Sequence, residues 1–166
     1  KVYLERIGLC CFSFVNNSPL LWSHYSGGHT GVCLVIDTKR FVLDFSLIKV
    51  NYRQALPKWN LVESRKRWGE SLEYNQNYDH VVLGTKYQEW AYEQEYRLIS
   101  PNRGKHELYP ESVLGVIFGA KMSSSRRIEI KEKIKNSYPH FQVIEASLEV
   151  SNGQVVVNGF ENRIED

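Results

Sequence analysis

The sequence predicts an α+β domain with a mainly antiparallel, mixed sheet and a few helices. Three observations lead to this prediction. Runs rich in Val and Ile, Gly31 to Asp37 and Val113 to Phe118, have the length and composition of buried strands. A Ser-Pro pair at Ser18 marks the start of a helix. Regular alternation of apolar and polar residues from Phe141 to Val150 predicts a half-buried strand.

The first quarter of the chain is predicted to form strand, helix and strand in that order. Leu9 to Phe14 is a short apolar run with aromatic content, which suits a buried strand. The helix that follows Ser18 should end near Gly27, which places His24 and Tyr25 in its last turn. Gly31 to Asp37 then supplies the next strand.

The middle of the chain is predicted to contain two strands with a helix between them. Lys49 to Tyr52 is a short strand candidate, and Trp59 to Tyr74 has apolar residues at helical spacing. Trp90 to Ile99 alternates bulky and polar residues, which predicts a strand. That strand would hold Glu93, Glu95 and Arg97 in a row on one face.

The last third is predicted to form strand, helix and hairpin. A helix should begin after the serines that end at Ser125 and stop before Pro139. Phe141 to Val150 and Gln154 to Asn158 then alternate as two strands. Asn152-Gly153 between them is typical of a tight type I′ turn.

Length and composition indicate one domain over residues 1–166, with no membrane-spanning segment. The chain has 166 residues and a net charge of +2, too small by itself to indicate a polyanionic partner. Its longest apolar stretches are far shorter than the ~20 residues of a membrane helix. Three cysteines without a C-x-x-C pair favour a reducing, cytoplasmic location. The chain opens at Lys1, which leads us to expect a piece of a longer protein.

One concentration of polar side chains lies between Ser23 and His29. Serine, histidine and tyrosine side chains stand there beside Gly27 and Gly28, at a helix end where a pocket can form. Taken singly, each of these side chains is better explained by packing or by capping of turn amides. Their density as a group favours a binding site.

A second concentration lies between Tyr92 and Arg97. Residues two apart on a strand lie roughly 7 Å from each other on one face. Periodicity alone favours a solvent-facing row in which Arg97 neutralises Glu93 and Glu95. The same spacing also suits an enzyme acting at a sugar C–N or C–O bond, where one carboxylate stabilises an oxocarbenium-like centre and the other handles a proton. The spacing permits both interpretations.

Metal and thiol chemistry have less support in the sequence. His24 and His29 alone do not complete the three or four ligands of a zinc site, so we predict no metal. Cys33 sits in an apolar strand, where a thiol is usually an inert core residue. A magnesium-dependent nucleic-acid effector using Asp37, Glu93 and Glu95 is a further alternative, with little support from a nearly balanced charge.

Several uncommon residues in order resemble a bacterial family known as a domain of unknown function, number twenty-nine seventy-one of its series. The resemblance spans Leu9 to about Lys121. The segments that carry it are Cys11-Phe12-Ser13, Trp22-Ser23-His24-Tyr25, His29-Thr30-Gly31, Val32-Cys33 to Asp37, Trp90-Ala91-Tyr92-Glu93-Gln94-Glu95-Tyr96-Arg97 and Ile117-Phe118-Gly119. That family has an earlier segment with an N-D-P motif, and nothing of that kind precedes Leu9.

The order of elements is also distantly similar to the ADP-ribosyltransferase fold. In that fold, a strand with F-S is followed by a helix with a tyrosine, a strand, and later a strand led by a glutamate. The similarity implies that Phe12 and Ser13 fall on a nicotinamide-pocket motif and that Tyr25 is the stacking aromatic. It implies that Glu95 is the catalytic glutamate and Glu93 the extra acid of arginine-modifying members.

Taken together, the two resemblances imply an NAD-dependent ADP-ribosyltransferase-like effector of bacterial defence or toxin type. NAD would be the nucleotide substrate, the acceptor a protein or nucleic acid, and Glu95 and Glu93 the catalytic residues. The expected cofactor-binding residues are Phe12, Ser13, Ser23, His24, Tyr25, His29 and Arg97. The alternative is a non-catalytic sensor whose aromatic side chains bind a nucleotide or a protein.

Overall fold

The computed structural model of the protein describes residues 7–40, 46–58, 79–149 and 152–158. The chain forms two compact units, each made of two separate stretches. Unit 1 combines Lys1–Phe14 with Leu43–Lys105, and unit 2 combines Val15–Val42 with His106–Asp166. Helices occur with both antiparallel and parallel strand pairs, so the α+β prediction is confirmed. The single domain expected from length stays a prediction.

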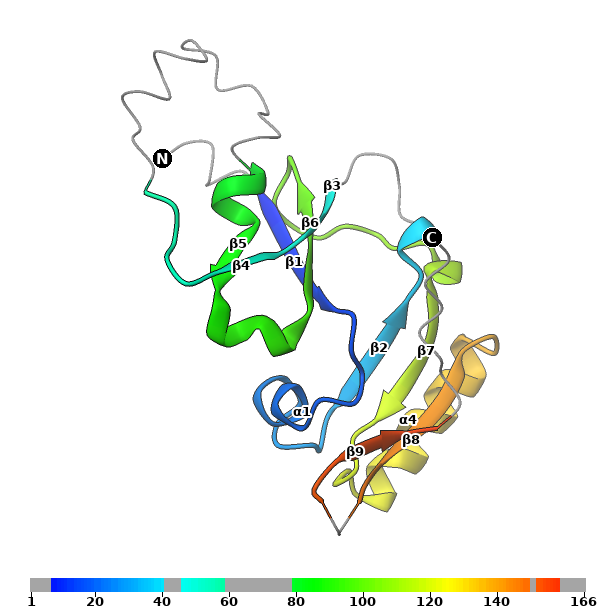
Figure 1. Cartoon of the computed structure of the whole chain (residues 1–166). Helices are drawn as coiled ribbons and strands as arrows, with labels where there is room; N and C mark the ends of the chain where they lie inside the picture. Colours follow the sequence, from blue (N-terminus) through cyan, green and yellow to red (C-terminus); the bar gives the residue numbers. More distant parts are fainter. Residues whose placement is uncertain (1–6, 41–45, 59–78, 150–151, 159–166) are drawn as a thin grey trace. The chain divides into compact units, whose positions relative to one another are not determined.

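Unit 1 contains a three-stranded antiparallel sheet in the order β1-β6-β3 (Figure 1). Its strands are β1 (Gly8–Ser13), β6 (Glu95–Ser100) and β3 (Ser46–Lys49). The strand expected from Leu9 to Phe14 is confirmed, but its burial is not, because Leu9, Cys10 and Cys11 are exposed. The central strand β6 carries the buried residues instead, among them Leu98 and Ile99.

A second, two-stranded parallel sheet in unit 1 pairs β4 (Asn51–Arg53) with β5 (Thr85–Tyr87). The single strand expected from Lys49 to Tyr52 is therefore two strands, β3 and β4, which meet at the buried Val50. A π-helical turn, η2 (Asp79–Leu83), precedes β5. The helix expected from Trp59 to Tyr74 lies outside the described residues.

The continuous strand predicted from Trp90 to Ile99 is wrong in its first half. Residues Gln88–Glu93 form a 3-10 helix, η3, and β6 begins only at Glu95. Gln94 between them adopts a left-handed conformation with φ of 44°, which ends η3 and redirects the chain. Glu93 therefore does not share a strand face with Glu95 and Arg97.

Unit 2 is built on a four-stranded sheet in the order β2-β7-β8-β9. Its strands are β2 (Val32–Ile36), β7 (Val113–Phe118), β8 (Gln142–Leu148) and β9 (Val155–Val157). β7 and β8 are parallel and are connected through helix α4 (Ser124–Ser137), whereas the other two pairs are antiparallel. Two 3-10 turns, η1 (Thr38–Arg40) and η4 (Pro110–Ser112), follow β2 and precede β7.

Alternation along β7 directs its side chains into two separate cores. Ile117 packs with Trp22 of helix α1 (Pro19–Tyr25) on one face of the sheet. Val116 and Phe118 pack on the other face, against Ile130 of α4. Within unit 2, α1 and α4 thus cover opposite faces of the sheet, as Figure 1 shows.

The predicted boundaries of the helix that follows Ser18 are confirmed. The Ser18 hydroxyl caps α1 by accepting from the Leu21 amide, and Pro19 takes the first helical position. Helix α1 ends at Tyr25, before Gly27 and Gly28, which both have positive φ. Ser123 caps α4 in the same way, so this helix begins at Ser124 and includes Ser125, earlier than predicted, and it ends before Pro139 as expected.

The predicted hairpin at the end of the chain is confirmed, but its turn is not a two-residue turn. Leu148 pairs with Val155, and the Glu149 amide donates to the Gln154 carbonyl oxygen, a register that does not place Asn152-Gly153 at the centre of a two-residue turn. Gly153 has a φ of 69°, as expected of a turn glycine.

The described residues include no helix with the length and apolar character needed to cross a membrane.

Candidate functional site

The centre of the candidate site is a cluster of two carboxylates and two cations in unit 1. Glu93 ends η3, Glu95 opens β6, Arg97 follows two residues later, and Lys86 lies in the middle of β5. The two carboxylates are almost fully buried, at 3% and 5% exposure. Burial of a carboxylate is costly unless it is paired, so these four side chains depend on one another.

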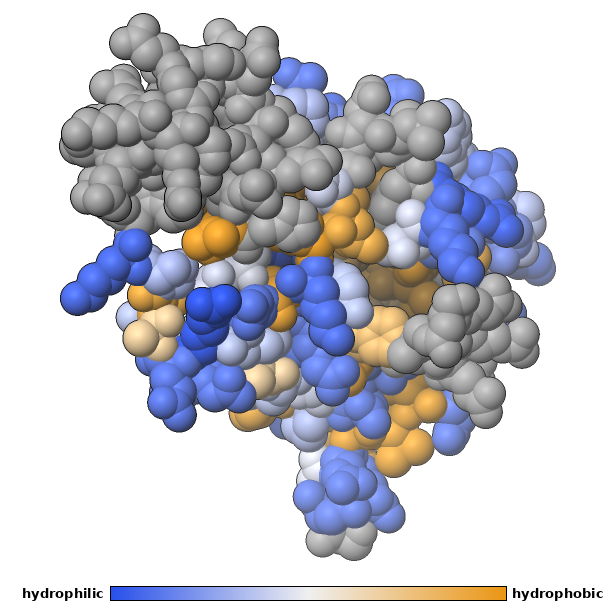
Figure 2. Space-filling model, turned by 45° about the horizontal axis from the view of Figure 1, so that its top comes forward, coloured by the Kyte–Doolittle hydropathy of each residue, from blue (hydrophilic) through white to orange (hydrophobic). Residues whose placement is uncertain are grey.

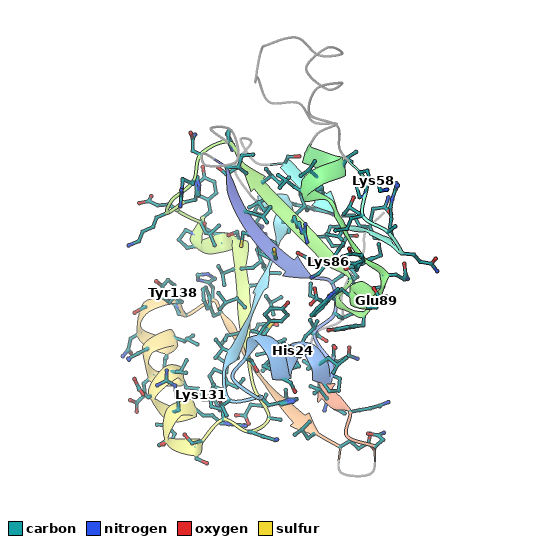
Figure 3. The ribbon with its side chains drawn as sticks, turned by 90° about the vertical axis from the view of Figure 1, so that its left-hand side faces the viewer. His24, Lys58, Lys86, Glu89, Lys131 and Tyr138 are labelled. Carbon is teal, nitrogen blue, oxygen red and sulfur yellow. The ribbon has the colours of Figure 1, made fainter. Side chains whose placement is uncertain are left out.

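Lys86 connects the two glutamates that the sequence analysis singled out. Its ammonium donates to Glu93 Oε2 and, at 3.0 Å, to Glu95 Oε2. The same nitrogen lies 5.0 Å from the centroid of the Trp90 ring, a cation–π contact. Figure 3 labels Lys86 on β5 and Glu89 on η3, the two elements that bring these groups together.

Arg97 forms a bidentate ion pair with the Glu95 carboxylate. Arg97 Nε donates to Oε1 at 2.8 Å, and one of its terminal nitrogens donates to Oε2 at 3.1 Å. The remaining terminal nitrogen donates to the Leu83 carbonyl oxygen. The pairing of Glu95 with Arg97 is the part of the predicted row that the strand does supply, because residues two apart share one face.

Two side-chain hydroxyls hold the backbone of Glu93 and Glu95 in place. Ser13 lies directly opposite Glu95 in the β1–β6 pairing, and its hydroxyl donates to the Glu93 carbonyl oxygen at 2.6 Å. The Glu95 amide donates to the Tyr52 hydroxyl at 2.8 Å. Strands β1 and β4 therefore clamp the junction between η3 and β6 on which both glutamates depend.

The electrostatic surroundings keep Glu95 ionised. Burial raises the pKa of its carboxyl, but hydrogen bonds from Arg97, Cys11 and Lys86 and the charge of Arg97 outweigh burial and hold that pKa at about 2. The pKa of Cys11 changes in the opposite direction: although the residue as a whole is exposed, partial burial of its thiol and the bond to Glu95 raise that pKa to about 11. Burial lowers the pKa of Lys86, but its hydrogen bonds to the two glutamates raise it overall.

These contacts overturn one interpretation of the sequence. The solvent-facing row of charges does not exist, because Glu93 and Glu95 are buried and cross-linked by Lys86. Sequence reasoning missed Lys86, Tyr52 and Cys11 as members of the cluster. Lys86 lies in a strand of three residues, too short for a periodic signal, and one of its partners, Glu93, comes from a 3-10 helix that alternation could not reveal.

The residues from Ser23 to His29 form a separate arrangement in unit 2. Ser23 Oγ lies 3.0 Å from His29 Nε2, which joins the last turn of α1 to the loop after it. His29 is buried and has a φ of 71°, an uncommon value for a residue with a side chain. The Tyr25 ring is 68% exposed and meets the His24 ring edge-on at 6.3 Å.

Gly119 explains why the chain can close tightly around His29. A Cβ atom at Gly119 would lie 2.2 Å from the His29 carbonyl oxygen, so only glycine fits. The Lys121 amide donates to that same oxygen, and the Gly119 amide donates to the Gly31 carbonyl oxygen. The Phe118-Gly119 segment noted in the sequence thus supports the His29-Thr30-Gly31 segment.

Phe12, Ser13 and Cys33 lie on strands β1 and β2. Phe12 is half-buried on β1, opposite Tyr96, and Ser13 is exposed at the end of that strand. Cys33 is half-buried in β2, where burial raises the pKa of its thiol. In the part of the chain that the structure describes, no group of three or more His, Cys, Asp or Glu side chains is arranged to hold a metal ion.

The family comparison covers both sets of residues. Residues 21–98 match the model of the family "Protein of unknown function (DUF2971)". This match confirms the resemblance to the family over residues 21–98, whereas Cys11-Phe12-Ser13 and Ile117-Phe118-Gly119 lie outside the matched range. The DUF2971 match begins at α1 and reaches Glu95 and Arg97, so it includes the Ser23–His29 pair and the whole η3–β6 junction. No curated protein and no solved structure matches the chain.

Proposed function

We propose that the chain is an NAD-dependent ADP-ribosyltransferase-like protein in which Glu95 is the catalytic carboxylate. One observation carries the proposal: Ser13, at the end of the Phe-Ser strand β1, lies directly opposite Glu95, the first residue of β6. A helix with Tyr25 and a further strand follow β1 in sequence, the order expected of this fold. The pairing thus joins the two segments expected to surround a nicotinamide ribose.

The chemistry expected of Glu95 is electrostatic. As nicotinamide leaves, positive charge develops at the ribose C1′ atom, and a fixed carboxylate stabilises it. A pKa of about 2 keeps Glu95 ionised throughout the physiological range. Both of its oxygens accept hydrogen bonds, so a ribose hydroxyl would have to replace Lys86 at Oε2 while Arg97 keeps the carboxylate oriented.

Glu93 suits the second acidic role. Its carboxylate meets the same ammonium as Glu95, so a single movement of Lys86 would release both groups. The released Glu93 would accept the proton of the attacking group. The contributions of Phe12, Arg97, His24 and Tyr25 to NAD binding, and the place of the protein in bacterial defence, stay predictions.

A non-catalytic binding module is the second candidate, and the completeness of the ion-pair cluster favours it. Two cations already satisfy the two buried carboxylates, and a closed network of this kind also occurs for purely structural reasons. In that case nucleotide or protein binding would leave the Lys86 contacts unchanged.

Release of nicotinamide from NAD by the full-length protein tests the proposal. We expect turnover in the wild type and a loss of about 10²-fold or more in Glu95→Gln, because the amide keeps the shape but removes the charge. Glu145→Gln is the matched control, since Glu145 is a surface glutamate paired with Arg127 and Lys131. Circular dichroism verifies that both variants are folded. Equal turnover in wild type and Glu95→Gln, or none in either, would favour the binding module.

A further inference from the structure

The contact between Ser23 and His29 joins an exposed hydroxyl to a buried imidazole. Ser23 lies on the exposed side of α1, whereas the His29 ring is only 7% exposed. The 3.0 Å separation of Ser23 Oγ and His29 Nε2 is a normal hydrogen-bond distance. A hydroxyl nucleophile and its base have this relation in covalent catalysis.

The backbone holds His29 in an energetically unfavourable state. Its φ of 71° lies in the left-handed region, and its amide donates to the carbonyl oxygen of the buried Trp22. Lys121 and Gly119 fix its carbonyl oxygen from the end of β7. Strained conformations of this kind persist where the surroundings enforce them, and they concentrate at functional sites.

The second nitrogen of the His29 ring provides an independent observation. Within the described part of the chain, His29 Nδ1 is buried and has no hydrogen-bond partner. Buried polar atoms are nearly always paired, so an unpaired one in a fixed ring calls for a functional explanation. If the proton resides on Nδ1, Nε2 is free to accept the proton of the Ser23 hydroxyl.

We propose that Ser23 is a nucleophile that takes an acyl group from an ester, with His29 as its base. The Ser23 oxygen bonds to the carbonyl carbon of the ester while its proton moves to His29 Nε2. The carbonyl re-forms, the bond to the leaving alcohol breaks, and the leaving oxygen takes the proton from Nε2. The product is an acyl ester on Ser23, which water cleaves by the same steps.

An ester is the class of electrophile that suits this pair. The hydroxyl, the neutral imidazole and the ester carbonyl are all uncharged before the attack, so the substrate does not have to bring a charge to the contact. The attack then places a negative charge on the carbonyl oxygen and a positive charge on the His29 ring, and both disappear when the leaving alcohol takes the proton. Burial and the positive charge of Lys121 lower the pKa of His29, which keeps the ring in its basic form at neutral pH. The inference is independent of the proposed action on NAD.

Acetylation by p-nitrophenyl acetate tests the proposal on the intact protein. We expect a burst of nitrophenolate and an acetyl group on Ser23, located by mass spectrometry of the peptide that contains it. Ser23→Ala should abolish the burst. Ser125→Ala is the matched control, because Ser125 is an exposed helical serine whose hydroxyl contacts another serine, Ser123, and it should leave the burst unchanged. Acetylation at lysines alone, or an equal burst in Ser23→Ala, would overturn the proposal.

The role of His29 needs a variant that tolerates its backbone. His29→Asn is suitable, because asparagine adopts the left-handed region more readily than most residues. We expect acetylation of Ser23 to slow by about 10²-fold. In the wild type, the rate should also fall at acid pH as His29 takes up a proton, a measurement that needs no variant. A rate that is the same across acid and neutral pH would exclude His29 as the base.

Discussion

The Lys86 ammonium donates hydrogen bonds to the carboxylates of both Glu93 and Glu95, although neither glutamate shares a strand with it. The three residues meet because η3 turns the chain back beside β5 before β6 begins. The stability of unit 1 should therefore depend on each member of this cluster.

Substitution of Glu95 by Gln should destabilise the protein by roughly 3 kcal/mol, because it leaves the half-buried Arg97 without its carboxylate partner and Lys86 with Glu93 alone. Urea unfolding followed by circular dichroism measures the change. Glu145→Gln removes a surface partner of Arg127 and should cost about 0.5 kcal/mol or less. Similar losses in the two variants would show that the buried cluster adds no stability beyond that of a surface pair.

The ionisation of Glu95 also predicts how stability changes in acid. Its pKa in the folded state, about 2, lies below the ordinary value of 4.5, so the unfolded chain binds the proton more tightly. The stabilisation is complete above about pH 5 and declines as pH falls towards 2. Unfolding free energies measured across this range should decline less steeply for Glu95→Gln than for the wild type. Parallel curves would contradict the pairing of Glu95 with Arg97 and Lys86.

His29 should titrate below the ordinary histidine value of 6.5, because burial and Lys121 disfavour its charged form. Nuclear magnetic resonance of the His29 ring carbons against pH measures this directly. The unfolded chain then binds more protons than the folded one as pH falls below 6.5, so this residue lowers stability in mild acid. A midpoint at or above 6.5 would mean that the ring is solvated or has an acidic partner.

Substitution of Gly119 by Ala should cost roughly 2 kcal/mol or more, since the new Cβ atom would lie 2.2 Å from the His29 carbonyl oxygen. Gly28→Ala is the matched control. Gly28 has a φ of 66° but open space around its would-be Cβ atom, so the cost should be only that of the backbone conformation, about 1 kcal/mol. Thermal unfolding separates the two cases, and equal effects would show that the loop around His29 adapts.

Local signals in the sequence were enough to place the helix ends and the Val-rich strands. Ser18 and Ser123 cap helices because a serine hydroxyl satisfies a first-turn amide whatever the rest of the fold does. Strand β7 was found because its apolar composition reflects burial on both faces. These features depend on neighbours in sequence or on composition alone.

The parts that could not be predicted depend on contacts between distant segments. Alternation from Trp90 onward is equally compatible with a 3-10 turn, and only the left-handed Gln94 separates η3 from β6. The sequence therefore singled out Glu93, Glu95 and Arg97, which do belong to one ion-pair cluster, but it predicted the wrong surroundings for them. Lys86 entered it through the parallel pairing of β4 with β5, which leaves no pattern in three-residue strands.

The interleaving of the two units determines the order in which they can be completed during synthesis. Strand β1 is made early, but its partner β6 emerges only after α1 and β2 of unit 2 have already been made. Strand β2 in turn waits for β7, which follows β6 closely in sequence. The β1–β6 and β2–β7 pairs cannot form on a growing chain until the stretch from Glu95 to Phe118 is available, and β8 and β9 complete the sheet of unit 2 only afterwards. A ribosome-bound chain that ends shortly before Glu95 would therefore expose the unpaired edges of β1 and β2 at the same time.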